Sequence, residues 1–207
     1  MLFVELLVPK GMFDEWERRV LARRLTARSL LSPGDGTTPA VDPGVMDLFD
    51  SLSHVVVREE EVWIAGGTLL DTPLDGSQEP WYVVNVIVGL WGREMSEHLV
   101  SRITAELAEA EERSEPRVVV NVIGLPEGGY GLRGRVWRSS DFLALIEEAK
   151  TGSAAQVPDG MVVDPVCGAT VPLEEAVILE RDGQTHGFCC THCRGHFVRE
   201  SSAAGAS

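Results

Sequence analysis

The feature that most constrains the fold is a pattern of strand, glycine turn and amphipathic helix that occurs twice. It spans residues 2–26, "LFVELLVPKGMFDEWERRVLARRLT", and again residues 80–104, "PWYVVNVIVGLWGREMSEHLVSRIT". A shift of 78 residues aligns identical residues at Val8/Val86, Leu21/Leu99, Arg24/Arg102 and Thr26/Thr104. Internal similarity of this kind indicates that one supersecondary unit has been duplicated.

Both units carry local helix signals. Asp14 and Glu17 fit a capping box at the start of the first helix. Apolar residues recur near helical spacing at Phe13, Trp16, Val20 and Leu25 in the first unit and at Met95, Leu99 and Ile103 in the second. A last helix, "SDFLALIEEAK", is predicted to begin near Ser140, which would cap it.

A β-rich run follows each helix. The first is "SHVVVREEEVWIAGG" and the second is "RVVVNVIGLPEGGYGLRGRVW", which ends in a glycine-rich hairpin. The layout therefore predicts an α/β (α+β) fold in which two tandem βαβ units form one sheet, with two helices packed on one face.

The chain divides near residue 150. The segment 151–160, "TGSAAQVPDG", is small, polar and punctuated by proline and glycine, as in a linker. We expect a large domain at 1–150, a small module at 161–201 and a disordered tail at 202–207. A module of about forty residues buries too little apolar surface to fold unaided, so it needs a disulfide or a metal ion.

Charge and hydropathy exclude several classes of partner. The chain has 32 Asp and Glu residues against 18 Lys and Arg, a formal net charge of −14, which disfavours nucleic acid and anionic membranes. No apolar run approaches the roughly 20 residues of a membrane span, and the first residues do not resemble a signal peptide. A cytoplasmic location is expected, where clustered cysteines serve metal binding or catalysis more often than disulfides.

The cysteines concentrate in the module. Cys167 and Cys189 are separated by 21 residues, and Cys189 and Cys193 by three. "DPVCG" reads as a turn, "AVILERDGQTHGFC" as two strands around a turn, and "THCRGHF" as the start of a helix. Cys189 at a strand end and Cys193 in the first helical turn bring their sulfurs to one point, and Cys167 arrives from the separate turn. Because adjacent cysteines form a strained disulfide ring, a Cys189–Cys190 redox pair is disfavoured, and Cys190 is expected to be an exposed reactive thiol.

The first domain resembles the tautomerase superfamily, on the two βαβ repeats that each open on a strand and on "LPEGGYGLRGRV" after the second. The resemblance implies a tautomerase-like sheet with two packed helices, often assembled as a trimer. It also implies an amino-terminal proline as general base, yet the matching position is Leu2. In the second repeat Pro80 matches but has no titratable nitrogen within the chain, and the substrate-binding arginine of small members falls near Met12.

Activity in the first domain therefore stays open. Arg133 and Arg135 in the glycine-rich hairpin are candidates for binding a small anionic molecule, with solvated surface arginines as the plainer interpretation. The alternative function is a divergent tautomerase or isomerase that acts on a small keto–enol carboxylate.

The module is similar to the YHS (TRASH-type) domain, a small treble-clef-like metal module, on "DPVCG", "DGQTHGFC", the C-x3-C pair and the trailing "HF". The resemblance implies Cys167, Cys189 and Cys193 as ligands. Asp164 is the candidate fourth ligand, with His192, His196 and Cys190 as competitors. The metal is Zn²⁺ or another soft ion such as Cu⁺, held either to fold the module or to be sensed or carried.

Overall fold

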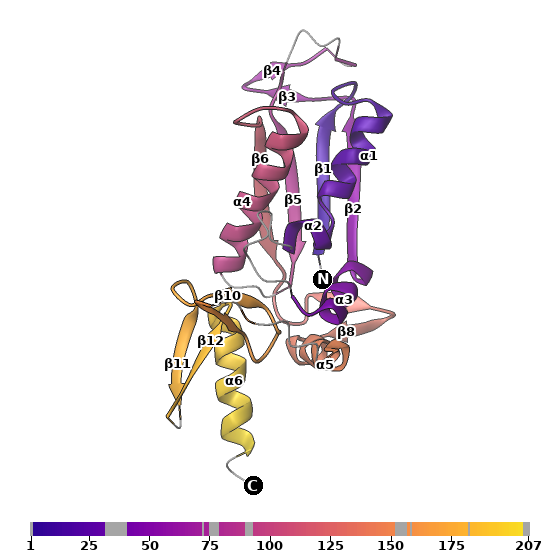
Figure 1. Ribbon diagram of the computed structural model, residues 1–207. Coiled ribbons are helices and arrows are strands. Elements are labelled where there is room, and N and C mark those ends of the chain that lie inside the picture. The colour runs from indigo at the N-terminus through magenta and orange to yellow at the C-terminus, as the bar shows by residue number, and fades with distance from the viewer. Residues whose placement is uncertain are drawn as a thin grey trace.

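The computed structural model describes residues 2–31, 41–71, 73–74, 79–89, 93–151, 157, 159–181 and 183–204. Figure 1 shows long strands with helices over them and, beyond one end of the sheet, the short strands and helix of the C-terminal module. Most of the expected linker, residues 152–156 and 158, lies outside the described residues.

The main sheet has four strands in the order β2-β1-β5-β6. Their bounds are Leu2–Pro9 for β1, Ser53–Glu60 for β2, Tyr82–Val88 for β5 and Val118–Gly124 for β6. β1 pairs with β2 in parallel, β5 pairs with β6 in parallel, and the two pairs meet where β1 and β5 run antiparallel. This topology confirms the prediction of two tandem βαβ units in one sheet.

Helices cover one face of this sheet (Figure 1). Those over the face are α1 (Glu15–Arg24), α2 (Ala27–Leu31) and α4 (Arg93–Ala110). The other two, α3 (Pro43–Ser51) and α5 (Ser139–Ala149), pack against each other at the end of the sheet on the side of the C-terminal module. The capping box at Asp14 and Glu17 is present, with both reciprocal hydrogen bonds. The prediction of Ser140 as a cap is wrong: α5 begins one residue earlier, and the Asp141 carboxylate instead accepts the Arg138 N–H at 2.7 Å.

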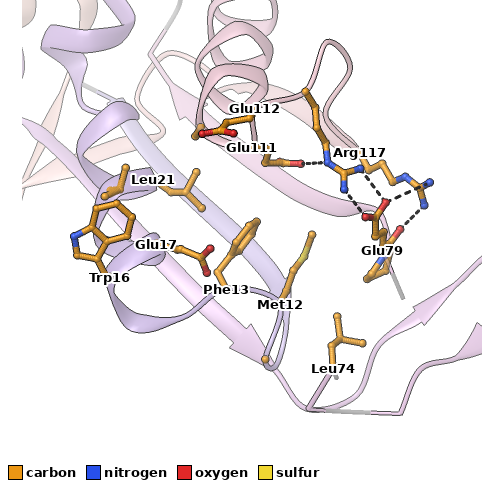
Figure 2. A pocket seen from close by; sticks show the side chains of 15 residues that line it. Met12, Phe13, Trp16, Glu17, Leu21, Leu74, Glu79, Glu111, Glu112 and Arg117 are labelled. Carbon is orange, nitrogen blue, oxygen red and sulfur yellow. Dashed lines mark hydrogen bonds and ion pairs between the residues drawn. The ribbon is translucent and has the colours of Figure 1, made fainter. Parts of the chain in front are cut away.

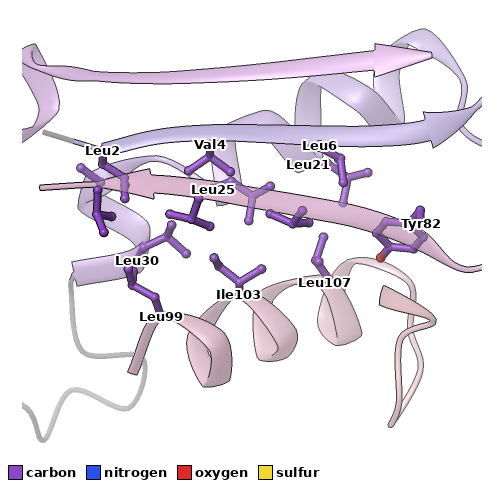
Figure 3. Close-up of a cluster of buried hydrophobic side chains, with 14 of the residues drawn as sticks. Leu2, Val4, Leu6, Leu21, Leu25, Leu30, Tyr82, Leu99, Ile103 and Leu107 are labelled. Carbon is purple, nitrogen blue, oxygen red and sulfur yellow. The ribbon is translucent and has the colours of Figure 1, made fainter. Parts of the chain in front are cut away.

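The core lies between the helices and the sheet (Figure 3). Alternate residues of each central strand point into it, as the period of two along a strand requires. The strands contribute Leu2, Val4, Leu6, Val8, Tyr82, Val84, Val86 and Val88, and the helices meet them with residues such as Leu21, Leu99, Ile103 and Leu107. Burying each such side chain contributes about 1.5–3 kcal/mol. Trp16, expected on the apolar helix face, is the exception, since 70% of its surface is exposed.

An ion-pair network joins the two repeats across the helices. The largely buried carboxylate of Glu106 on α4 meets Arg24 of α1 at 3.1 Å and Arg102 of its own helix at 2.7 Å. These two arginines occupy equivalent positions in the repeats. The network therefore explains why both positions carry a guanidinium: together they compensate one shielded negative charge.

Two hairpins extend from the main sheet. The first pairs β3 (Ile64–Ala65) with β4 (Thr68–Leu69), and the second pairs β7 (Tyr130–Leu132) with β8 (Arg135–Trp137), as predicted for the glycine-rich segment. None of the helices in the described part of the chain combines the length and apolar character needed to cross a membrane.

The C-terminal module consists of two small antiparallel sheets and one helix. Its elements are β9 (Met161–Val163), β10 (Thr170–Pro172), β11 (Val177–Arg181), β12 (Gln184–Phe188) and α6 (Thr191–Ala204). The β11–β12 pair and the helix after it match the sequence-based expectation, whereas the β9–β10 pair was not anticipated. Helix α6 continues to Ala204, so its last residues overlap the tail that was expected at 202–207. Residues 205–207 lie outside the described residues.

Candidate metal centre

Four side chains from separate parts of the module converge on one point. The ligand atoms of Asp164, Cys167, Cys189 and Cys193 all lie within 4.8 Å of one another. The Sγ atom of Cys189 lies 3.6 Å from that of Cys167 and 3.7 Å from that of Cys193. All four cysteines of the chain are free thiols, so none of these short distances reflects a disulfide bond.

The local fold explains how each side chain reaches this point. Asp164 directly follows β9, and Cys167 lies in the turn that leads to β10. Cys189 directly follows β12, and Cys193 lies in the first turn of α6. A turn, a strand end and a helix start therefore supply the donors, as the sequence spacing predicts.

Asp164 has two roles: its carboxylate converges with the three thiols, and it also accepts hydrogen bonds from the backbone around them. One oxygen of its carboxylate accepts the N–H of Val166 at 2.8 Å and that of Cys167 at 3.3 Å, and the other accepts the N–H of Cys189 at 2.9 Å. This side chain is fully buried, and burial together with the Cys167 thiol raises its pKa to about 6, against the opposing effect of the backbone N–H groups. The carboxylate thus fixes the turn and the strand end that carry two of the thiols.

The thiols perturb one another strongly. Hydrogen bonds from Cys189 and Cys193 lower the pKa of Cys167, whereas the Cys167 sulfur raises the pKa of both partners. Removing one proton from the group therefore makes removal of the next more difficult. A bound cation relieves this repulsion, because it is attracted to every thiolate at once.

Cys190 is not the exposed thiol that the sequence suggested. Only 6% of its surface is exposed, and it packs with Phe188 and Cys193 in the small core of the module. Backbone N–H groups of His192 and Cys193 at the start of α6 approach its sulfur. Cys190 thus belongs to the packing around the cluster, and it is not among the four converging residues.

The competing histidines take other places. His192 lines the same cavity as the three thiols, but neither it nor His196 joins the four converging ligand atoms in the described residues. His186 packs against the Phe197 ring with a centroid distance of 4.8 Å. Asp164 is therefore the fourth donor that the geometry brings to the three thiols.

The cluster is open on one side. A cavity of about 650 Å³ lies between the module and the first domain, and Cys167, Cys189 and Cys193 line it while Asp164 does not. Its remaining wall is largely apolar and includes Leu31, Phe49, Met95, Phe142 and Ile146. The amine of Lys150, after α5, donates to the Pro165 carbonyl at 3.2 Å and joins the end of α5 to the turn that carries Cys167. Spacing along the chain gives no signal for this cavity, since its wall comes from both domains.

The residues considered for catalysis in the first domain are dispersed. Leu2 is 2% exposed and belongs to the core, so its side chain offers no titratable group. Arg133 occupies the exposed turn of the β7–β8 hairpin and Arg135 begins β8, and neither lines the two cavities described for this chain. Met12 and Pro80, in contrast, line one common cavity at the other end of the sheet.

Comparison with known proteins gives structural likeness only. No protein-family profile matches the chain, and no curated protein matches it. A fused 4-OT solved as an asymmetric trimer is similar at TM-score 0.46 and 16% identity, over 65% of this chain and 94% of that one.

Two further structures are similar to the same degree. A member of the cis-3-chloroacrylic acid dehalogenase family matches at TM-score 0.49 and 15% identity, over 69% of this chain and 90% of that chain. MIF2 of Leishmania major matches at TM-score 0.41 and 16% identity, over 66% of this chain and 97% of that chain. Each is a likeness in chain trace and carries no assignment of activity.

Proposed function

We propose that this chain is a metal-binding protein that holds one soft metal ion through Asp164, Cys167, Cys189 and Cys193. The observation that carries the proposal is the convergence of these four ligand atoms within 4.8 Å. In this proposal the module is YHS-type, and the first domain is a tautomerase-like scaffold without proline-based catalysis.

The donor set favours zinc. Three thiolates and one carboxylate are ligands that Zn²⁺ accepts, and a tetrahedral zinc with Zn–S bonds of 2.3 Å separates its sulfurs by about 3.8 Å. The sulfur separations of 3.6 and 3.7 Å agree with that value. Cu⁺ is the second choice, because it shares the preference for thiolates but has less affinity for a carboxylate oxygen.

The ion supports the fold of the module and remains accessible. A domain of this size lacks apolar burial, so binding free energy serves as folding free energy. The three cysteines that face the 650 Å³ cavity leave the ion reachable from one side. Four protein donors complete a tetrahedral zinc site, as in structural zinc sites, so the open side suits exchange of the ion rather than a further ligand.

The scaffold in this proposal is a homo-oligomer, a trimer by the family resemblance. The sheet face opposite the helices has no layer over it within the described chain, and Val56, Val119 and Ile123 expose 37, 44 and 46% of their surfaces there. Between the apolar rows, Arg58, Glu5, Asn85 and Asn121 form a chain of hydrogen bonds across the strands. Because its polar groups are already paired, this face can be buried at low cost.

Metal analysis of the purified chain tests the proposal. Protein prepared without added metal is expected to carry about one zinc per chain by mass spectrometry of the elements. Cys189→Ser should lose this metal, whereas Cys190→Ala, which changes a cysteine outside the four donors, should retain it. A wild type without stoichiometric metal, together with a Cys189→Ser variant that folds equally well, would disprove the proposal.

A further inference from the structure

A second cavity lies at the end of the sheet away from the cysteine module (Figure 2). Its volume is about 510 Å³, and its lining comes from the first turns of α1, the end of α4 and the segment that enters β5. It shares no lining residue with the cavity beside the cysteines. What it binds is therefore a question separate from the metal.

One part of the wall is apolar and rigid. Met12, Phe13 and Leu21 lie along it (Figure 2), and Phe13 packs edge-on against the Tyr82 ring at a centroid distance of 5.8 Å. The Tyr82 hydroxyl in turn donates to Glu111 on the same cavity wall. The apolar surface thus has a fixed shape, which suits the hydrocarbon part of a small molecule.

Trp16 stands at one side of this cavity with 70% of its surface exposed. An indole ring is among the side chains that gain most from burial, and the ring of Trp16 is left open beside a hollow. Its π face also attracts a cation that lies within about 6 Å of the ring centre. This position therefore offers a stacking surface to a ligand.

The charges of the lining have a negative excess. Four carboxylates, those of Glu17, Glu79, Glu111 and Glu112, stand against two guanidiniums, those of Arg113 and Arg117.

Both arginines are already engaged. Arg113 binds the Glu79 carboxylate with both terminal nitrogens, one of them at 2.9 Å, and Arg117 donates to the Glu79 carbonyl at 2.6 Å (Figure 2). The hydrogen bond from Arg113 also lowers the pKa of Glu79, which keeps that pair ionised. The positive charges of both arginines are thus balanced by Glu79, and an incoming anion would be repelled by the remaining carboxylates of the lining.

Glu112 supplies a carboxylate without a cationic partner in the described residues. It sits just beyond α4 with a φ of 53°, a conformation that glycine adopts far more readily. The N–H of Glu112 bonds the Glu109 carbonyl at 3.2 Å, and the N–H of Arg113 bonds the Ala108 carbonyl at 2.9 Å. This is the Schellman termination of a helix, in which glycine is the usual residue at the place of Glu112.

We propose that this cavity binds a small organic cation: a protonated or quaternary amine that carries an apolar group. The apolar group lies against Met12 and Phe13. The charged nitrogen lies between the Trp16 ring and the carboxylates of the lining, among which that of Glu112 has no cationic partner in the described residues. The net charge of −14 raises the local concentration of such a ligand around the whole protein.

Calorimetric titration of the full, metal-loaded chain tests this assignment with three probes of similar size. Benzyltrimethylammonium is the cation, benzyl alcohol the neutral comparator and phenylacetate the anion. The cation is expected to bind at least about tenfold more tightly than the neutral probe and to weaken as salt is added. Phenylacetate binding as tight as that of the cation, or no heat from the cation up to about 10 mM, a concentration that detects even millimolar dissociation constants, overturns the proposal.

Variants place the binding in this cavity. Trp16→Ala and Glu112→Gln change exposed side chains, and each is expected to weaken cation binding about three- to tenfold. Glu148→Gln removes an exposed carboxylate on α5, outside the lining, and should leave the affinity unchanged. Cation binding that is the same in both cavity variants as in the wild type contradicts the assignment, and circular dichroism establishes that the variants are folded.

Discussion

The first domain and the cysteine module are held together in different ways. Fifteen buried residues form one continuous core in the described part of the first domain, from Leu2 to Leu107. The module has three buried residues in its cluster, Phe188, Cys190 and Cys193, two of which are cysteines. Apolar burial therefore suffices for the first domain, whereas the module depends on what its polar and sulfur atoms bind.

Because of this difference, the free energy of folding is lost in different ways in the two parts of the chain. In the first domain, the loss of one contact removes a small part of the free energy that comes from burying apolar surface, and the rest of the core remains. In the module the Asp164 carboxylate is fully buried beside three thiols, a grouping that is unfavourable without a compensating cation. In the proposed metal-loaded state, the bound ion would offset the cost of this concentration of polar groups.

Metal removal should have the largest effect. Zinc binding contributes on the order of 10 kcal/mol to folding in small zinc peptides, which is comparable to the total stability of a typical domain. Chelation is expected to unfold the module and to leave the first domain intact. Hydrogen exchange measured by mass spectrometry should then show lost protection in residues 161–204 and unchanged protection in the four main strands.

The Cys189→Ser variant offers the same comparison without a chelator. It is expected to reproduce the exchange pattern of the chelated wild type. Equal protection of the module with and without metal would mean that its short strands and α6 are stable by themselves, and the contrast between the two domains would disappear.

A core truncation should have the opposite distribution. Leu107 of α4 is fully buried, so Leu107→Ala should lower the free energy of unfolding of the first domain by about 2–5 kcal/mol. The metal content should not change. Urea unfolding followed by circular dichroism measures the first quantity, and Val136→Ala, which truncates an exposed side chain of β8, is the control. Loss of metal in Leu107→Ala would show that the two domains fold as one unit.

Much of the fold was predictable because its signals are local. The repeat, the alternation in the strands and the Asp14 capping box each depend on residues close in sequence. Trp16 was misplaced for the same reason: helical spacing puts it near the apolar side, whereas in the fold it stands beside a cavity with 70% of its surface exposed. The cap at Ser140 was wrong because Asp141 competes for the N-terminal backbone of α5.

The cluster of three cysteines and one aspartate was also predictable in outline. The spacing of the three cysteines fixed the turn, strand end and helix start from which they come. The burial of Cys190 and the three hydrogen bonds to Asp164 were not predictable, because they depend on how the turn after β9 packs against the end of β12. The two cavities could not be predicted from the sequence either, since residues far apart in the chain form each wall.

Asp164→Asn should have an intermediate effect, and it separates the two roles of this residue. Asparagine keeps one carbonyl oxygen for the backbone N–H groups but removes the negative charge from the site. Metal affinity is expected to fall by at least about tenfold, which corresponds to about 1.4 kcal/mol. Competition with a zinc indicator measures it, and Asp159→Asn, which changes an exposed carboxylate just before the module, is the control. Unchanged affinity would mean that Asp164 only fixes the turn through its hydrogen bonds and does not bind the metal.

The smallest effect is expected at Glu112, where the first domain departs from optimal stability. Glu112→Gly relieves a left-handed backbone and should raise the free energy of unfolding by about 0.5–1 kcal/mol, reduced somewhat by the greater freedom of glycine in the unfolded chain. Arg133→Gly, at a φ of 52° in the β7–β8 turn, is the matched control and should give a similar gain. Only Glu112→Gly should also weaken binding of benzyltrimethylammonium. If both variants gain stability and neither loses cation affinity, the strain at Glu112 has no link to the cavity, and burial alone describes the first domain.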